Sequence, residues 1–278
     1  MIEIQESDNM RDSMRDNIDA FSRSRMLLGA EGMERLKRAR VAVFGLGGVG
    51  GYIVEALTRS GVGELDLIDP DRICFSNLNR QILATRETIG RYKTDVARER
   101  IKIINPDAIV RIYNLFFLPD TADNSDFTRY DYIADAIDTV TGKLELITKA
   151  RDAGTPIISS MGAGNKLDAS ALEVADIYQT SICPLARVMR RELKKREIKN
   201  LKVVYSKEVP MTPIENDKYM KDIEDIEEDI KTGEDVEPPG MSRDQNRRSI
   251  PGSVAFVPAA AGLIMAGEIV RDLLAIGD

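Results

Sequence analysis

The chain has 278 residues, 43% of them hydrophobic, so it can bury an ordinary core as one large α/β domain or two small ones. It contains no histidine, which excludes imidazole bases and histidine-ligated metal sites. Two cysteines can build neither a disulfide framework nor, by themselves, a four-thiolate zinc site. The N-terminal residues are acidic and polar with no signal-peptide pattern, and we expect a cytoplasmic protein.

The net charge of −7 is unevenly spread along the chain. Residues 215–237 hold eleven acids and three lysines, and their low apolar content predicts a surface loop. Residues 187–202 hold eight bases and two acids. This basic segment is therefore available for a polyanion.

A glycine-rich motif follows the first predicted strand. Residues 1–20 are expected to form a polar arm or short helix, and a helix that ends at Lys37 follows. An apolar strand over 39–44 then leads into Gly45, Gly47, Gly48 and Gly50 and a helical pattern from Tyr52. Glycines let backbone N–H groups approach an anion at the helix N-terminus. The motif predicts a phosphate site, and the alternative is a tight strand-to-helix turn without a ligand.

A second strand strengthens the nucleotide interpretation. It covers residues 63–69 and ends at Asp69, 19 residues after Gly50. This spacing is typical of a carboxylate that contacts a ribose hydroxyl.

The remaining pattern alternates strands and helices. Helices are predicted over 92–104 and 142–153, with strands over 109–116, 130–137 and 156–160. An extra strand over 170–177, a basic helix over 184–197 and a strand over 201–205 follow. We expect an α/β fold with a doubly wound, largely parallel, Rossmann-like sheet and a C-terminal α+β extension, and ligands at the carboxyl ends of its strands.

An uncharged run over residues 250–267 reaches the length of a membrane span. Pro251 and Pro258 interrupt it and leave an apolar helix of nine residues before Glu268. We expect a buried helix that returns to cover the sheet, and no membrane insertion.

Several motifs together resemble the superfamily of ATP-dependent adenylating enzymes that includes ubiquitin-activating enzymes and the ThiF, MoeB and HesA proteins. The matching segments stand in that family's order and are the glycine motif, Asp69-x-Asp71, Asn77-Leu78-Asn79-Arg80-Gln81, Gly90-Arg91-Tyr92-Lys93 and Ala136-Ile137-Asp138. The resemblance implies an ATP-binding region over 21–165, after the arm over 1–20. Residues 166–278 would form the extension, packed with it as one continuous unit.

Within this superfamily, the chain looks most similar to the tRNA threonylcarbamoyladenosine dehydratases. The similarity extends to Phe21-Ser22-Arg23, Ile158-Ser159-Ser160-Met161-Gly162-Ala163, Pro184-Leu185-Ala186 and Ala255-Phe256-Val257-Pro258. Two features depart from the pattern. Cys183 stands where an acid is expected, and the acidic segment 215–237 is enlarged.

The resemblance implies a role for individual residues. Asp138 would hold Mg²⁺, with a helix N-cap as its alternative. Arg80 and Lys93 would neutralise the triphosphate of ATP. Asn77 would be catalytic or a turn residue, while Asp71 and Gln81 would support nucleotide binding. Arg23 would reach the ATP site of a partner in a homodimer, or remain an exposed arginine of the arm.

Two other groups of residues have simpler interpretations. Cys74 and Cys183 are expected to be ordinary residues, because neither has a basic neighbour in sequence. The basic helix presents side chains that share part of one face, where a solvated surface and contact with the tRNA backbone are both open. These side chains are Arg187, Arg190, Arg191, Lys194 and Lys195.

The combined hypothesis is an ATP-dependent enzyme that adenylates threonylcarbamoyladenosine in tRNA beside the anticodon and closes it into a ring. The first alternative is adenylation of the C-terminus of a ubiquitin-like sulfur-carrier protein, although the paired C-x-x-C motifs common in those enzymes are absent from this sequence. A nicotinamide-dependent oxidoreductase and a non-catalytic tRNA-binding module are further alternatives. Whether a sulfur-transfer partner protein cooperates is left open.

Overall fold

The computed structural model describes residues 20–118, 126–214 and 251–276. Nearly all of the expected arm over 1–20, and the acidic segment 215–237, lie outside the described residues.

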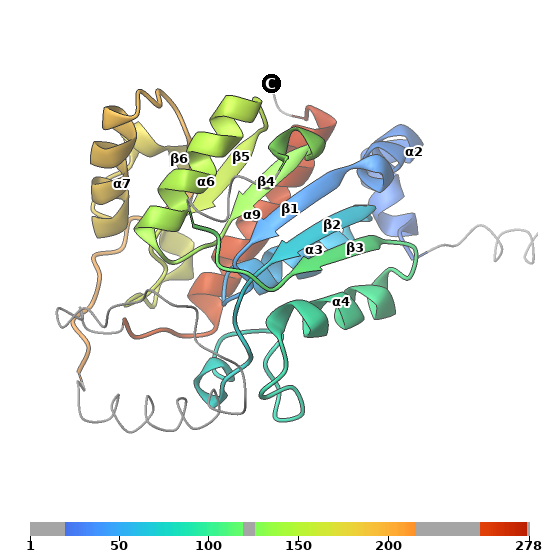
Figure 1. Cartoon of the computed structure of the whole chain (residues 1–278), viewed down its shortest axis with the longest axis horizontal. Helices are drawn as coiled ribbons and strands as arrows, with labels where there is room; N and C mark the ends of the chain where they lie inside the picture. Colours follow the sequence, from blue (N-terminus) through green and yellow to red (C-terminus); the bar gives the residue numbers. More distant parts are fainter. Residues whose placement is uncertain (1–19, 119–125, 215–250, 277–278) are drawn as a thin grey trace, which may run out of the picture.

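A seven-stranded sheet forms the centre of the molecule, in the order β3-β2-β1-β4-β5-β7-β6 (Figure 1). Its strands are β1 (Arg40–Phe44), β2 (Glu64–Ile68), β3 (Ile109–Tyr113), β4 (Tyr132–Asp135), β5 (Ile157–Ser160), β6 (Leu172–Asp176) and β7 (Lys202–Ser206). All neighbouring pairs are parallel except β6 and β7. The predicted doubly wound sheet is confirmed, although several strands are shorter than expected.

Helices cover both faces of this sheet. They are α2 (Ser22–Arg38), α3 (Gly50–Arg59), α4 (Lys93–Ile104), α6 (Val140–Ala153), α7 (Pro184–Lys195) and α9 (Phe256–Leu274), with single 3-10 turns at η1 (Phe75–Asn77), η2 (Phe127–Arg129), η3 (Ala169–Ala171) and η4 (Ile177–Gln179). Gly61 has φ +87°, so it supplies the left-handed residue that follows α3. Pro184 is the first residue of α7, where proline costs no hydrogen bond.

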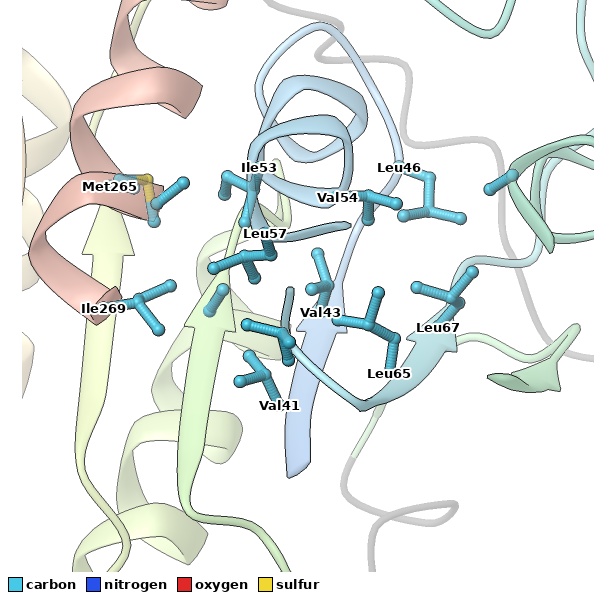
Figure 2. Close-up of a cluster of buried hydrophobic side chains, with 14 of the residues drawn as sticks. Val41, Val43, Leu46, Ile53, Val54, Leu57, Leu65, Leu67, Met265 and Ile269 are labelled. Carbon is cyan, nitrogen blue, oxygen red and sulfur yellow. The ribbon is translucent and has the colours of Figure 1, made fainter. Parts of the chain in front are cut away.

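Alternating side chains of the central strands divide the core between the two faces. Val41 and Val43 of β1 point toward α3 and α9, where Ile53 and Met265 meet them (Figure 2). Their neighbours in β1 instead pack in a second cluster that includes residues of α6. Side chains alternate because successive residues of a strand point to opposite faces. Both clusters are apolar, which explains why β1 reads as a continuous apolar run.

The C-terminal segment contributes to the same sheet and core. β7 pairs with β5, and α9 packs so closely on α3 that a side chain at Gly262 would collide with the carbonyl oxygen of Val49. α9 has 19 residues, whereas the sequence predicted nine, because Pro258 lies in its first turn and does not end the helix. Among the described residues, no helix combines the length and the apolar character that a bilayer span requires.

Candidate active site

A cavity of about 670 Å³ lies beyond the carboxyl ends of β1, β2, β4 and β5. Its size is that of a typical small-molecule or cofactor site. Ten of the residues singled out in the sequence border it: Gly45, Gly47, Gly48, Asp69, Asp71, Asn77, Arg80, Gln81, Lys93 and Asp138. The carboxyl edge of the sheet therefore gathers residues that are far apart in sequence.

The glycine turn between β1 and α3 forms one wall of the cavity. Gly45 has φ +86°, and a Cβ there would lie 2.6 Å from the carbonyl oxygen of Ala136. Gly50 lies under the turn, and a Cβ on it would collide with the carbonyl oxygen of Gly45. Both positions therefore need glycine, because side chains would push β4 and α3 away from the turn.

Gly47 has a different role from Gly45 and Gly50. The atom nearest to a Cβ on Gly47 would be Nε2 of Gln81 at 4.0 Å, so a side chain there would occupy the cavity. No side chain of the described residues caps the N-terminus of α3 at Val49. Backbone N–H groups and the positive end of the helix dipole thus face the cavity, which is the arrangement that binds phosphates.

Asp69 joins the glycine turn to the end of β2. Its carboxylate accepts hydrogen bonds from the N–H of Leu46 at 2.5 Å and of Asp71 at 2.8 Å. The side chain is buried, and this burial is the largest influence on the pKa of its carboxyl, which is raised above the ordinary value despite the opposing effect of Lys93. Asp69 thus fixes the turn as well as facing the cavity.

Lys93, the first residue of α4, points its ammonium group at two carboxylates. Its Nζ lies 2.7 Å from Oδ2 of Asp71 and 3.7 Å from Oδ1 of Asp69. Burial is the largest influence and opposes the charge, but the two carboxylates together outweigh it, so the pKa of Lys93 is raised. The side chain is therefore a buried cation at the cavity wall.

The segment after β2 supplies three polar side chains. Asn77 accepts a hydrogen bond from the N–H of Cys74 at 3.2 Å, so its side chain also stabilises the η1 turn. Arg80 donates from Nη1 to the carbonyl oxygen of Ser76 and to Oδ1 of Asn79, both at 2.9 Å. Gln81 is buried, and its Oε1 has no hydrogen-bond partner among the described residues. A buried acceptor of this kind is costly unless a ligand or water satisfies it.

Asp138 follows β4 and is exposed at the edge of the cavity. Within residues 20–118, 126–214 and 251–276, no cluster of three acidic or sulfur side chains could hold a metal ion by itself. A single carboxylate at this edge is the kind of ligand that Mg²⁺ takes together with nucleotide phosphates, and the assignment of Asp138 to the metal stays a prediction.

The remaining predicted residues lie outside the cavity. Arg23 is exposed on α2. Of the five basic residues on α7, Arg190 is partly buried and donates to the carbonyl oxygen of Thr180 at 2.9 Å. The other four are exposed: Arg187, Arg191, Lys194 and Lys195.

The cavity is also bordered by residues to which the sequence analysis gave no role in the site. Cys74 and Arg72 border it, and Lys143 of α6 forms part of its floor. Pro251 and Ser253 border it from the segment before α9, and Asn79 donates to the carbonyl oxygen of Ser253 at 2.9 Å. A lysine inside a predicted helix gives no signal of burial, whereas the uncharged run from residue 250 could have pointed to the segment before α9.

The fold and the cavity define a class of protein: an α/β protein whose glycine turn, buried lysine and carboxylates line a cavity suited to a phosphorylated ligand. The sequence profile of the ThiF family matches residues 21–278. The chain therefore belongs to the ThiF family, and the predicted resemblance is confirmed.

Individual relatives differ in how much of this chain they match. The Bacillus subtilis protein named tRNA threonylcarbamoyladenosine dehydratase is 39% identical over 257 residues, which cover 91% of this chain and 94% of the relative. The crystal structure of the Escherichia coli tRNA N6-threonylcarbamoyladenosine dehydratase, TcdA, in complex with ATP has a TM-score of 0.75 and 29% identity, over 92% of this chain and 93% of that one. A Thermus thermophilus sulfur carrier protein adenylyltransferase is 35% identical over only 52% of this chain and 54% of its own length.

Proposed function

We propose that this protein is an ATP-dependent tRNA threonylcarbamoyladenosine dehydratase that acts in the cytoplasm. The observation that carries the proposal is the similarity to dehydratases over more than nine-tenths of the chain, including one that binds ATP. The similarity to a sulfur-carrier adenylyltransferase covers only half of each chain. It gives that alternative less support, and we do not advance it.

ATP would lie with its phosphates over the glycine turn at the N-terminus of α3. Gly47 leaves room there for a phosphate next to the backbone, and Gln81 presents its polar side chain beside it. Asp69 and Asp71 stand at the end of β2, where a ribose would be held. Arg80 and Lys93 would neutralise the phosphates.

Asp138 would hold Mg²⁺ at the same edge, and the ion would supply charge neutralisation for the phosphates. Lys93 reaches Asp71 in this structure, so a phosphate oxygen would take the place of one of its carboxylate partners. The ammonium group of Lys93 would then face the negative charge that develops as pyrophosphate leaves. Asn77 would orient the reacting groups from the η1 turn.

The chemistry proceeds in two steps. A carboxylate oxygen of the threonyl group attacks the α-phosphorus, and the bond to the β-phosphate oxygen breaks, releasing pyrophosphate. A nucleophilic atom of the same modification then attacks the activated carbonyl carbon, loses its proton to solvent and expels AMP. No histidine is required, because the first nucleophile is already ionised and the second attack is intramolecular.

The tRNA would contact exposed basic residues of α7, and the active form would be a homodimer. Arg187, Arg191, Lys194 and Lys195 are exposed on that helix and offer a cationic surface to a phosphate backbone. Arg23 is exposed on α2, from where the partner's Arg23 would approach the ATP cavity.

Pyrophosphate release tests the proposal. Purified protein with ATP and Mg²⁺ should release pyrophosphate with tRNA that bears threonylcarbamoyladenosine and not with the same tRNA lacking the modification. Asp138→Ala should abolish turnover while tRNA affinity stays nearly unchanged, because this exposed side chain lies at the nucleotide cavity and not on α7. Release driven by a small diglycine-ended protein, and not by modified tRNA, would support the sulfur-carrier alternative.

A further inference from the structure

A buried ion pair lies at the cavity floor, and the proposed reaction leaves it without a role. Lys143 belongs to the first turn of α6, and Asp135 is the last residue of β4. Their side chains are 1% and 0% exposed, and Nζ of Lys143 lies 3.1 Å from Oδ2 of Asp135. Both charges are thus fully removed from water.

The ammonium group of Lys143 has two further partners, both in β5. It donates to Oγ of Ser159 at 3.3 Å and to the carbonyl oxygen of Ser160 at 2.8 Å. Ser159 in turn donates to Oδ2 of Asp135 at 2.5 Å. All three donors of the ammonium are used, and one side chain joins the carboxyl ends of two neighbouring strands.

Two walls of the cavity begin at these strand ends. Oδ1 of Asp135 accepts a hydrogen bond from the N–H of Ile137 at 3.1 Å, within the segment 136–139 that carries Asp138. Ser160 leads directly into the segment 161–164, which also borders the cavity. The network therefore sets the position of one segment relative to the other.

Stability alone does not account for this pair. Removing two charges from water costs several kcal/mol for each ion, and an apolar pair of similar shape is often as stable. A network with every hydrogen bond made does, however, hold its members in one geometry.

We propose that Lys143 is a positioning residue that fixes segment 136–139 against segment 161–164, so that the substrate carboxylate and the α-phosphate are aligned for attack. This inference rests on the proposed adenylation, because alignment is measured through it. Lys143 itself would touch neither reactant.

Three variants separate positioning from stability. Lys143→Met keeps the side-chain length and removes the positive charge, so it leaves the buried carboxylate of Asp135 without its cation. Asp135→Asn/Lys143→Met removes both charges and should recover much of the unfolding free energy that the single variant loses. Asp66→Asn is the matched control: its carboxylate is also fully buried in this sheet and held by Arg40 at 2.7 Å, but does not border the cavity.

We expect kcat for pyrophosphate release to fall at least about tenfold in both Lys143 variants, since small misplacements of reacting groups are costly. The dissociation constant for ATP should stay within about twofold, because the glycine turn, Arg80 and Lys93 come from other elements. Asp66→Asn should lower the melting temperature without changing kcat. A double variant that recovers wild-type kcat along with its stability would overturn the inference.

Hydrogen exchange gives a readout that needs no turnover. Peptides covering 136–139 and 161–164 should exchange faster in both Lys143 variants and at the wild-type rate in Asp66→Asn. Unchanged hydrogen exchange of these peptides in the Lys143 variants would also contradict the inference. An inactive wild-type protein would instead count against the proposed function, so the two failures are distinguishable.

Discussion

Lys93 meets two carboxylates at the place where the proposed triphosphate would lie. Asp71 holds it at 2.7 Å and Asp69 at 3.7 Å, and the lysine side chain is only 7% exposed. The ammonium compensates the buried Asp69 carboxylate, whose pKa is raised by burial. Lys93 therefore contributes to stability as well as to the proposed phosphate contact.

The loss of stability that Lys93→Met causes should depend on pH. The pKa of Asp69 is raised, so the folded protein binds the proton of this carboxyl more tightly than the unfolded chain does. The contribution of this carboxyl to the stability of the fold is therefore present below pH 3.8 and is lost as the pH rises through the folded-state pKa. Removing the ammonium raises that pKa further. Urea unfolding should show a deficit of about 3 kcal/mol at pH 7 that shrinks toward pH 4.

The control for this prediction lies on the same helix. Lys102 is in the last turn of α4 and donates to the carbonyl oxygen of Pro106 in an exposed position. Lys102→Met should give a small difference that is constant between pH 4 and pH 8. A constant deficit for Lys93→Met would show that Asp69 does not depend on its charge.

Single residues were predictable where a motif placed them. Asp138 and Lys93 could be located at the cavity because each stands at the junction of a strand or loop with a helix, and parallel strands bring such junctions to one edge. Lys143 could not, since its burial depends on three partners from β4 and β5. The spacing of residues along the sequence does not predict contacts of this kind.

At the scale of elements, the turn between β1 and α3 separates two uses of glycine. Gly50→Ala should unfold or strongly destabilise the protein, because its methyl group would collide with the carbonyl oxygen of Gly45. Gly47→Ala should keep the fold, since the nearest atom would be 4.0 Å away, yet it should weaken ATP binding at least about tenfold by filling the cavity.

Circular dichroism melting and ATP titration check this pair of variants. The melting temperature of Gly47→Ala should lie close to that of the wild type while its ATP affinity falls. Unchanged ATP affinity in that variant would place the phosphates elsewhere. A stable Gly50→Ala protein would contradict the packing of α3 against the turn.

Helix α7 allows a test of tRNA contact by charge. Arg187 and Lys194 are exposed and seven residues apart, so they share one face. Arg187→Gln/Lys194→Gln should weaken tRNA binding and reduce the slope of log affinity against log salt by about 2, because two phosphate contacts are lost. Filter binding between low and high salt measures this slope.

Arg190→Gln serves as the comparison on the same helix. Its guanidinium donates a hydrogen bond to the carbonyl oxygen of Thr180, which precedes α7 in the sequence. The variant should therefore melt at a lower temperature, while the dependence of tRNA affinity on salt should stay unchanged. An unchanged slope in the double variant would leave α7 as a solvated surface.

Local sequence patterns predicted the range of α4 well, but they did not predict the length of α9. α4 matches its expected range because Tyr92-Lys93-Thr94 opens it and Asn105-Pro106 follows its end. α9 was predicted too short, because a proline was taken to interrupt the helix where it occupies the first turn. The difference depends on where the helix begins, and only the packed structure fixes that.

At the scale of the whole molecule, the described residues after 165, which are 166–214 and 251–276, share the sheet and the core of the preceding segment. β7 pairs with β5, and Met265 and Ile269 of α9 join the cluster formed by β1, β2 and α3 (Figure 2). The doubly wound part could be predicted from alternating elements. The covering of α3 by α9 could not be located, because an apolar helix does not specify which face it covers.

Removal of residues 166–278 should therefore abolish cooperative folding. The shortened chain would expose one edge of β5 and the apolar surface of α3 that α9 covers. Scanning calorimetry should show no cooperative transition, whereas the full chain should show one. A sharp transition near that of the full chain would mean that the first segment is an independent domain.

The contact between Gly262 and the start of α3 has a consequence for biosynthesis. Every other wall of the cavity precedes α9 in the chain, so a nascent polypeptide emerges from the ribosome with the back of its phosphate-binding turn uncovered. We therefore expect nucleotide to be captured only after translation has passed α9, and partly synthesised chains to need protection by chaperones until then.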